Sequence, residues 1–203
     1  MFAAFKRRYN FKRLKDKRYN FLFDSPPSNE WVCFDCETTG LNPRKDDILS
    51  IGAVLIRGNR IFTSQKLELF IKPKGSINVD SIKVHRLRHC DLQGGMGAEE
   101  AVLRFLEFVG ARPLVGYYLE FDVAMINKYL KPLLGIVLPN PKIEVSGLYY
   151  DKRQTFIPQE NIDLRFDTLL RELNLPRLGQ HDAFNDALMT AMMYVKLQQI
   201  ERV

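Results

Sequence analysis

Two pairs of reactive side chains overlap in the segment WVCFDCETTG, at positions 31–40. Cys33 and Cys36 have the C-x-x-C spacing that is typical of redox and zinc sites. Asp35 and Glu37 form an acidic pair two residues apart, which could bind a cation. The geometry of the chain in this segment decides which pair can do chemistry.

Strand geometry favours the carboxylates. Side chains alternate between the two faces of a strand, so residues two apart share a face and residues three apart point in opposite directions. In an extended segment the two acids therefore lie together, whereas the two thiols cannot reach the distance that a disulfide requires. Zinc would need four ligands, and neither Cys90 nor the three histidines have a suitable spacing. We therefore interpret Cys33 and Cys36 as small core residues.

The residues that follow the acids predict a turn. Thr38-Thr39-Gly40 comes directly afterwards, and glycine permits tight turns that other residues resist. Such a turn would leave two hydroxyl groups and several backbone groups beside the carboxylates. On these residues alone, a solvated strand end explains the acidic pair equally well.

The rest of the chain predicts the elements that must position this turn. β-forming runs separated by Gly58-Asn59 indicate three antiparallel strands, and later segments have apolar residues at helical spacing. This order indicates an α/β fold with a mixed sheet. The expected strands are 31–35, 48–56, 60–72, 113–118 and 142–146. The expected helices are 99–109, 121–130 ended by Pro132, 163–173 capped by Asp163, and 182–199, with a surface insertion at 149–161.

The positive charge of the protein belongs to its N-terminal segment. Residues 1–23 carry eight lysines and arginines against one acid, so this segment has a charge of +7 and the remainder −1, for a total of +6. We treat residues 1–23 as a basic, aromatic arm, residues 24–30 as a linker and residues 31–203 as the main domain. The arm could bind nucleic acid, lie on an anionic membrane, contact a polymerase or another protein, or be a solvated or docked tail.

Composition sets broader limits. A chain of 203 residues with 46% hydrophobic and 27% charged residues is typical of one globular domain. No apolar stretch approaches the roughly 18 residues of a membrane-spanning helix, and no apolar signal region follows the basic N-terminus. Three cysteines are an odd and sparse set that favours a reducing compartment, so we expect a cytoplasmic protein.

Three segments, in order, resemble the motifs of one enzyme family. FDCETTGL at 34–41, VGYYLEFDVAMIN at 115–127 and QHDAFNDALMTA at 180–191 are similar to the motifs of the DEDD (DnaQ-like) 3′–5′ exonucleases, subgroup DEDDh. This family includes the proofreading epsilon subunit of bacterial DNA polymerase III. The resemblance covers residues 31 to about 197. It implies a ribonuclease H-like sheet, with three antiparallel strands and then parallel strands, and helices on both faces.

The resemblance also implies a metal centre. Two divalent cations, Mg²⁺ or Mn²⁺, would be held by Asp35, Glu37, Asp122 and Asp186. His181, in the loop before the last helix, would be the general base that takes a proton from the attacking water. Electrostatics supports the cations independently, because two carboxylates about 5 Å apart repel by about 3 kcal/mol at an effective dielectric near 20. Four carboxylates form six such pairs, and their summed repulsion exceeds the net stability of a typical domain. The cluster therefore needs protons or hard cations to neutralise it.

The same resemblance implies contacts with the end of a nucleic acid. The predicted contacts of the 3′-terminal nucleotide are Thr38, Gly40, Leu41, His85 and Phe121. Leu41 and Phe121 could equally be core residues, and His85 a surface residue. Tyr117-Tyr118 stand where many members have histidine and asparagine, which affects local substrate contacts rather than the metal ligands.

These features predict a metal-dependent 3′→5′ exonuclease that releases nucleoside 5′-monophosphates from single-stranded or frayed DNA ends. An RNA-directed exonuclease of the same family is the first alternative, because no residue pattern here reads a 2′-hydroxyl reliably. The second alternative is a non-catalytic nucleic-acid-binding module that kept the fold and lost the chemistry.

Overall fold

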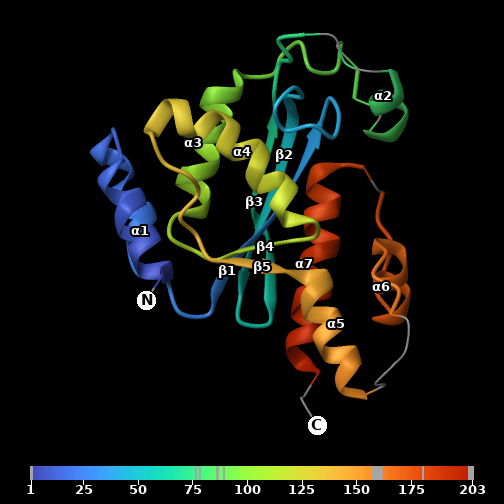
Figure 1. Cartoon of the computed structure of the whole chain (residues 1–203). Helices are drawn as coiled ribbons and strands as arrows, with labels where there is room; N and C mark the ends of the chain where they lie inside the picture. The colour runs from blue at the N-terminus through green and yellow to red at the C-terminus, as the bar shows by residue number, and fades with distance from the viewer. Residues whose placement is uncertain are drawn as a thin grey trace.

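A mixed sheet of five strands forms the centre of the protein. The computed structural model in Figure 1 describes residues 2–75, 77, 79–85, 87–88, 90–156, 162–179 and 181–200. The strands are β1 (Glu30–Thr38), β2 (Ile48–Arg57), β3 (Arg60–Phe70), β4 (Leu114–Gly116) and β5 (Lys142–Glu144), in the order β3-β2-β1-β4-β5. The first three pair antiparallel, β4 is parallel to β1, and β5 is parallel to β4. The predicted mixed sheet is confirmed.

Helices cover both faces of the sheet (Figure 1). They are α1 (Phe2–Lys12), the 3-10 helix η1 (Lys17–Phe23), α2 (Val79–His85), α3 (Ala98–Val109), α4 (Leu119–Leu134), α5 (Val145–Phe156), α6 (Phe166–Glu172) and α7 (Ala183–Gln199). One buried cluster lies between the sheet and α3 with α4, where the ring centres of Phe34 and Phe105 are 4.7 Å apart. The other lies between the sheet and α5, α6 and α7, where Trp31 packs on Tyr194. No helix among the described residues is long and apolar enough to cross a membrane.

Alternation along β1 separates its two cysteines. Cys33 is buried in the cluster on the α7 face, and Cys36 is buried in the cluster on the α3–α4 face. Both thiols are free, and burial raises the pKa of each well above its ordinary value. A thiol with a raised pKa stays protonated and is a poor nucleophile or metal ligand. The prediction that they are core residues is confirmed.

A glycine lets α7 approach the sheet closely. Gly52 of β2 is paired with Asp35 of β1. A Cβ atom at position 52 would lie 2.2 Å from the backbone carbon of Ala183, so only glycine allows this contact. The first turn of α7 therefore lies beside the acidic end of β1.

α4 is longer than the sequence predicted. It continues through Pro132 to Leu134, whereas the proline was expected to end it. Pro132 lies in the last turn, and the burial of Leu130 and Leu134 favours the helix there despite the missing amide donor. The helix ends at Gly135, whose left-handed backbone (φ 75°) other residues rarely adopt.

The predicted surface insertion at 149–161 was wrong for its first part, because residues 145–156 form α5. Val145, Leu148 and Tyr149 recur at helical spacing and pack in the cluster that contains α7. The start of this helix also shortens the predicted strand 142–146 to β5. Residues 157–161 lie outside the described part of the chain.

α6 begins at Phe166 rather than at the predicted residue 163. Asp163 lies before the helix, where its carboxylate accepts hydrogen bonds from the Arg165 amide (3.0 Å) and the Thr168 hydroxyl (2.8 Å). Asp163 therefore stabilises the start of α6 by hydrogen bonds from a position two residues before the N-cap, which is Arg165.

The N-terminal arm packs against the body. Leu14, Tyr19 and Leu22 are buried in the cluster that contains α3 and α4. The Lys15 amide donates to the carbonyl of Leu134 at the end of α4 (3.0 Å). Residues 24–29 are exposed and lead into β1. The arm is thus docked, with α1 at one side of the molecule (Figure 1).

Candidate active site

The acidic end of β1 is the centre of the site. Asp35 and Glu37 share one face of the strand, and Glu37 is 9% exposed. Burial raises the pKa of Glu37 to about 7, and the charges of Asp186 and Asp182 contribute. Burial also raises the pKa of Asp35, followed by the charge of Asp122 and then that of Glu37. The acids that contribute to these shifts, Asp122, Asp182 and Asp186, are all distant from the pair in the sequence.

Asp122 reaches the site from the first turn of α4. Its carboxylate accepts a hydrogen bond from the backbone amide of Cys36 (3.1 Å), which lies between the two acids of β1. The residue is 3% exposed, and this burial raises the pKa of Asp122, although the hydrogen bond from Cys36 partly offsets the effect. The bond ties the start of α4 to the end of β1.

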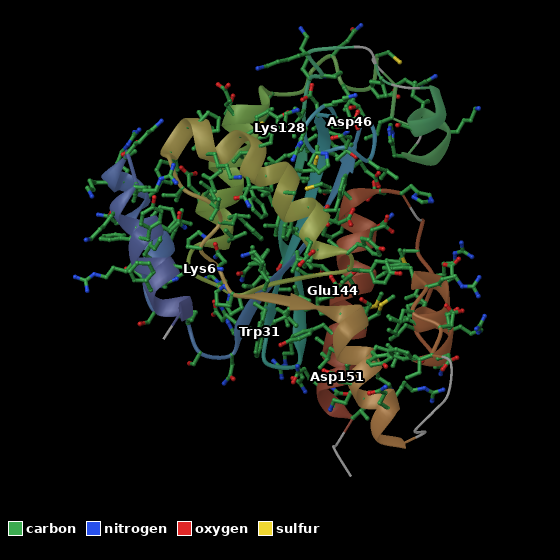
Figure 2. All side chains as sticks on the ribbon, viewed as in Figure 1. Lys6, Trp31, Asp46, Lys128, Glu144 and Asp151 are labelled. Carbon is green, nitrogen blue, oxygen red and sulfur yellow. The ribbon has the colours of Figure 1, made fainter. Side chains whose placement is uncertain are left out.

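Glu144, at the end of β5, holds the start of α4 in place. Its carboxylate oxygens accept hydrogen bonds from the amides of Tyr118 (3.1 Å) and Leu119 (2.9 Å). A carboxylate at this position is also favoured by the helix dipole. Figure 2 shows Glu144 where the sheet meets α4. No motif marked this residue, which lies in the middle of the predicted strand 142–146.

His181 and Asp186 come from the start of α7. Asp182 caps the helix by accepting a hydrogen bond from the Asn185 amide (2.9 Å). His181 precedes the cap with a left-handed backbone (φ 61°), and its amide donates to Asp186 Oδ2 (2.9 Å). The structure therefore places His181 before the helix, as expected, and folds it back over Asp186.

Glu37 and Asp186, with His181 beside them, lie close enough together for a cation to be held among them. One potential ligand atom from each lies within 4.8 Å of the other two. Asp186 Oδ1 is buried and has no hydrogen-bond partner among the described residues, which is unusual for a buried oxygen. Burial raises the pKa of Asp186 to about 6. Carboxylate oxygens that lack protein donors suit a hard divalent cation, so the residues present fit such an ion.

An open cavity of about 200 Å³ lies over these groups and is lined by Asp35, Tyr117, Phe166, His181 and Asp186. The Tyr117 hydroxyl donates to the carbonyl of Leu164 (2.9 Å), and its ring centre is 5.0 Å from that of Phe166, edge to face. The two aromatic residues form one wall. Tyr117 was noted from the sequence only as a departure from the family pattern, and no local signal indicated Phe166.

A second cavity, of about 270 Å³, is lined by both His85 and His181. His85 is 5% exposed; its Nδ1 accepts a hydrogen bond from the Leu87 amide (3.0 Å), and its Nε2 is buried without a partner in the described part of the chain. Burial, followed by the charge of His181, lowers the pKa of His85. His85 is therefore not a surface residue, and it lies beside the predicted general base.

The turn after β1 presents the other predicted contacts. Thr38 is buried, and its hydroxyl donates to the carbonyl of Gly40 (2.8 Å). Leu41 is 86% exposed, so it is not a core residue. Phe121 is half-buried and lines a groove of about 750 Å³ at the start of α4, together with Pro43. Leu41 and Phe121 are both accessible.

An ion pair fixes this turn to α4. Lys128 Nζ donates to the Asp47 carboxylate (2.5 Å) and to the carbonyl of Asp46 (2.8 Å), and the Tyr129 hydroxyl also donates to Asp47 (2.8 Å). Burial alone would raise the pKa of Asp47, but these hydrogen bonds lower it. Figure 2 shows Asp46 and Lys128 close together. Because α4 also carries Asp122, one helix positions both the turn and an acid of the site.

The sequence is similar to bacterial replication proteins. It is 30% identical over 168 residues to the DNA polymerase III PolC-type of Caldanaerobacter subterraneus subsp. tengcongensis, covering 83% of this chain and 11% of that protein. It is 29% identical over 167 residues to the DNA polymerase III subunit epsilon of Aquifex aeolicus, covering 82% of this chain and 79% of that protein. The chain thus spans about a tenth of the PolC-type protein but most of the epsilon subunit.

The fold is similar to that of Escherichia coli exonuclease I in complex with a dT13 oligonucleotide, with a TM-score of 0.67, 15% identity, and coverage of 85% of this chain and 41% of that chain. At this identity the likeness concerns the fold alone. A model of the exonuclease family matches residues 32–194, which include the four acids and His181. The chain therefore belongs to the exonuclease family, within the DEDD (DnaQ-like) superfamily of ribonuclease H-like fold.

Proposed function

We propose that the protein is a metal-dependent 3′→5′ exonuclease that removes nucleoside 5′-monophosphates from single-stranded or frayed DNA ends. The observation that carries this proposal is the convergence of four carboxylates, from β1, α4 and α7, whose pKa values are all raised by burial. Such a cluster is stable in its charged form only when cations neutralise it.

The four acids would hold two divalent cations, Mg²⁺ or Mn²⁺. The pKa of Asp35 is raised by burial and then by the charges of Asp122 on α4, Glu37 on β1 and Asp186 on α7. Because it lies among these acids, Asp35 would contact both ions. Glu37 and Asp186 would complete the ion beside His181, and Asp122 would hold the other. When bound, the cations would lower the pKa of the attacking water and stabilise the charge on the attacking and leaving oxygens.

His181 is the proposed general base. Its side chain is exposed at the rim of the cavity, and its backbone is tied to Asp186. Its imidazole would take the proton of the water that attacks the terminal phosphorus, while the bond from phosphorus to the preceding 3′-oxygen breaks. A base of this kind typically contributes about 10²- to 10⁴-fold to the rate.

DNA is the proposed substrate. Thr38, Gly40 and Leu41 would contact the terminal nucleotide from the turn, with Phe121 and His85 on the other sides. The exonuclease I of similar fold was solved with a DNA oligonucleotide, and the similar proteins are named as DNA polymerase III components. A DNA polymerase is accordingly the proposed protein partner, through the arm or another surface.

We propose a cytoplasmic location for the enzyme. Cys33 and Cys36 lie on opposite faces of β1 and cannot form a disulfide with each other, which suits a reducing compartment. Fluorescence microscopy of the tagged full chain would test this placement, and export of the protein would contradict it.

Matched DNA and RNA strands labelled at the 5′ end test the function. With Mg²⁺ or Mn²⁺ the wild-type protein should shorten the DNA stepwise from its 3′ end, and EDTA or Asp35→Asn should abolish this activity. Asp24→Asn, which removes an exposed carboxylate from the linker, is the matched control and should keep full activity. Degradation of RNA alone would make the DNA assignment wrong. Binding without any degradation would indicate a non-catalytic module.

A further inference from the structure

We propose that the exposed side of α1 is a second nucleic-acid-binding surface, which holds the single strand upstream of its 3′ end. The surface, termed the α1 face, consists of Phe5, Arg8, Tyr9, Lys12 and Arg13. The inference rests on the proposed function, because it assigns the same substrate to a part of the protein distant from the acids.

The opposite side of α1 is fixed to the body. The Asn10 side chain forms two hydrogen bonds with the backbone of Val137, from Nδ2 to the carbonyl (2.7 Å) and from the Val137 amide to Oδ1 (3.0 Å). Arg7 donates to the carbonyl of Asp24 (3.0 Å), and Leu14, two residues after the end of the helix, is 4% exposed. These contacts present the α1 face in one orientation, unlike a solvated tail.

The α1 face carries parallel rows of aromatic and basic side chains. Phe5 and Tyr9 are 69% and 57% exposed and lie four residues apart, so they form one row along the helix. Arg8 and Lys12 are exposed with the same spacing and form the adjacent row. The Arg13 guanidinium lies over the Tyr9 ring, 5.8 Å from its centre. Aromatic rings that stack on bases, next to cations that contact phosphates, are the combination that binds single strands.

Charge favours nucleic acid as the ligand of this surface. The arm carries +7 and the rest of the chain −1, so the arm supplies the attraction for phosphates that the acidic site lacks. A helix that lies on a membrane separates an apolar face from a charged one. In α1 the aromatic and basic rows share the same exposed side, which suits a ligand that offers both bases and phosphates.

The position of α1 predicts a dependence on substrate length. The arm contacts residues that follow the end of α4, whereas Asp122 lies in its first turn. The 12 residues from Asp122 to Leu134 correspond to about 18 Å at 1.5 Å per residue, and the α1 face lies on the far side of α1, which is itself about 10 Å across. A strand would need about eight nucleotides to cover these roughly 28 Å at the 3.4 Å rise of stacked bases. Shorter substrates should not reach the α1 face.

The test compares DNA strands of about four and about 30 nucleotides, which lie well below and above this limit. Arg8→Gln/Lys12→Gln should weaken binding of the long strand about tenfold at low salt and reduce the slope of log affinity against log salt by about 1.4, for two lost phosphate contacts. Phe5→Ala/Tyr9→Ala should weaken binding about tenfold with little change in slope. Turnover of the short strand should be unchanged in both.

Arg60→Gln/Lys196→Gln is the matched control, because it removes the same charge from exposed positions on β3 and α7. It should change neither the affinity nor the slope. All substituted side chains are exposed, so thermal unfolding of every variant should match the wild type. The control therefore separates a local surface from a general effect of net charge.

Equal salt slopes for the wild type and Arg8→Gln/Lys12→Gln would overturn the proposal. So would binding of phosphatidylserine vesicles that depends on the α1 face while long-strand affinity does not. If the short strand is not degraded by any variant, the proposed exonuclease function fails. Binding of the long strand would still test the α1 face independently.

Discussion

Acids at the two ends of the turn between β1 and β2 have opposite electrostatic surroundings. At the end of β1, burial and neighbouring acids raise the pKa values of Asp35 and Glu37. Ten residues after Glu37, hydrogen bonds from Lys128 and Tyr129 overcome the effect of burial and lower the pKa of Asp47. Both regions contain carboxylates that are partly or fully buried, but only the second has a neutralising cation, Lys128, within the chain.

This difference separates a structural acid from the acids that we propose to be functional. Asp47 is neutralised by Lys128, so its charge serves to hold the turn on α4. The acids of β1 are surrounded by other acids, so their charge must be balanced by protons or by cations from solution. Without cations they destabilise the fold, and strongly shifted groups of this kind are typical of functional sites. Four predictions test the comparison.

The largest expected effect is the loss of activity on removing an acid of the site. Asp186→Asn should lower kcat about 10³-fold, or about 4 kcal/mol of transition-state stabilisation, because it removes a proposed cation ligand. Asp47→Asn should lower kcat far less, because Asp47 contacts no proposed ligand. Steady-state kinetics on a short DNA strand measures both. Equal losses in the two variants would contradict the distinction between structural and functional acids.

The next effect concerns the ion pair of the turn. Lys128→Met should lower the free energy of unfolding by about 2 kcal/mol, because it leaves Asp47 without its cation. Lys131→Met, on the exposed side of the same helix, is the control and should be nearly neutral. Urea unfolding gives the values. In Lys128→Met/Asp47→Asn part of the loss should be recovered, and strict additivity would show that the pair is not coupled.

The stability of the metal-free protein should fall as pH rises from about 4.5 to about 7. In the folded protein the pKa of Glu37 is about 7 against an ordinary 4.5, and that of Asp186 is about 6 against 3.8. The folded state therefore binds more protons than the unfolded state in this window, so stability is fully present at the acidic end and is lost as pH rises through the folded values. Taken in full, these two pKa differences would correspond to about 6 kcal/mol, but solvent screens both groups at the open mouth of the site, so we expect a loss of about 2 kcal/mol.

Urea unfolding at several pH values, with EDTA or with Mg²⁺, measures this dependence. Saturating Mg²⁺ should reduce the loss, because cations then replace the protons. A metal-free protein whose stability rises over this window would show that the site acids are not destabilising.

The smallest effect is a gain in stability. Glu37→Gln should raise the free energy of unfolding of the metal-free protein by about 1 kcal/mol near neutral pH, because it removes a buried charge among like charges. Glu107→Gln, at an exposed position of α3, should change it little. With saturating Mg²⁺ the gain should disappear or reverse, since the variant loses a ligand. A gain that is independent of Mg²⁺ would point to another cause.

Local sequence determined which residues of β1 lie together. The alternation of side chains in a strand puts Asp35 and Glu37 on one face and separates Cys33 from Cys36, whatever the rest of the chain does. The start of α7 at its capping residue, Asp182, was likewise readable from residue types. These features depend on the backbone of a few neighbouring residues, so a sequence pattern can encode them.

The lengths of the helices were harder to predict from the sequence, because tertiary packing competes with the local conformational preference of the residues. Pro132 indicates an end to α4, but the buried Leu130 and Leu134 carry the helix past it. In α5, Val145 and Tyr149 belong to a core cluster that exists only once α7 lies beside them. Tertiary burial decided both cases.

Only the tertiary structure decided how the site is held and charged. Glu144 at the start of α4, Phe166 beside Tyr117, and Gly52 under the first turn of α7 belong to no motif, since each acts on a residue distant in the chain. Burial raises the pKa of Asp35, and the charge of Asp122, 87 positions later, raises it further, so both causes depend on the fold. Repulsion between charges falls with distance, and no local pattern encodes the distance between two segments that only the fold brings together.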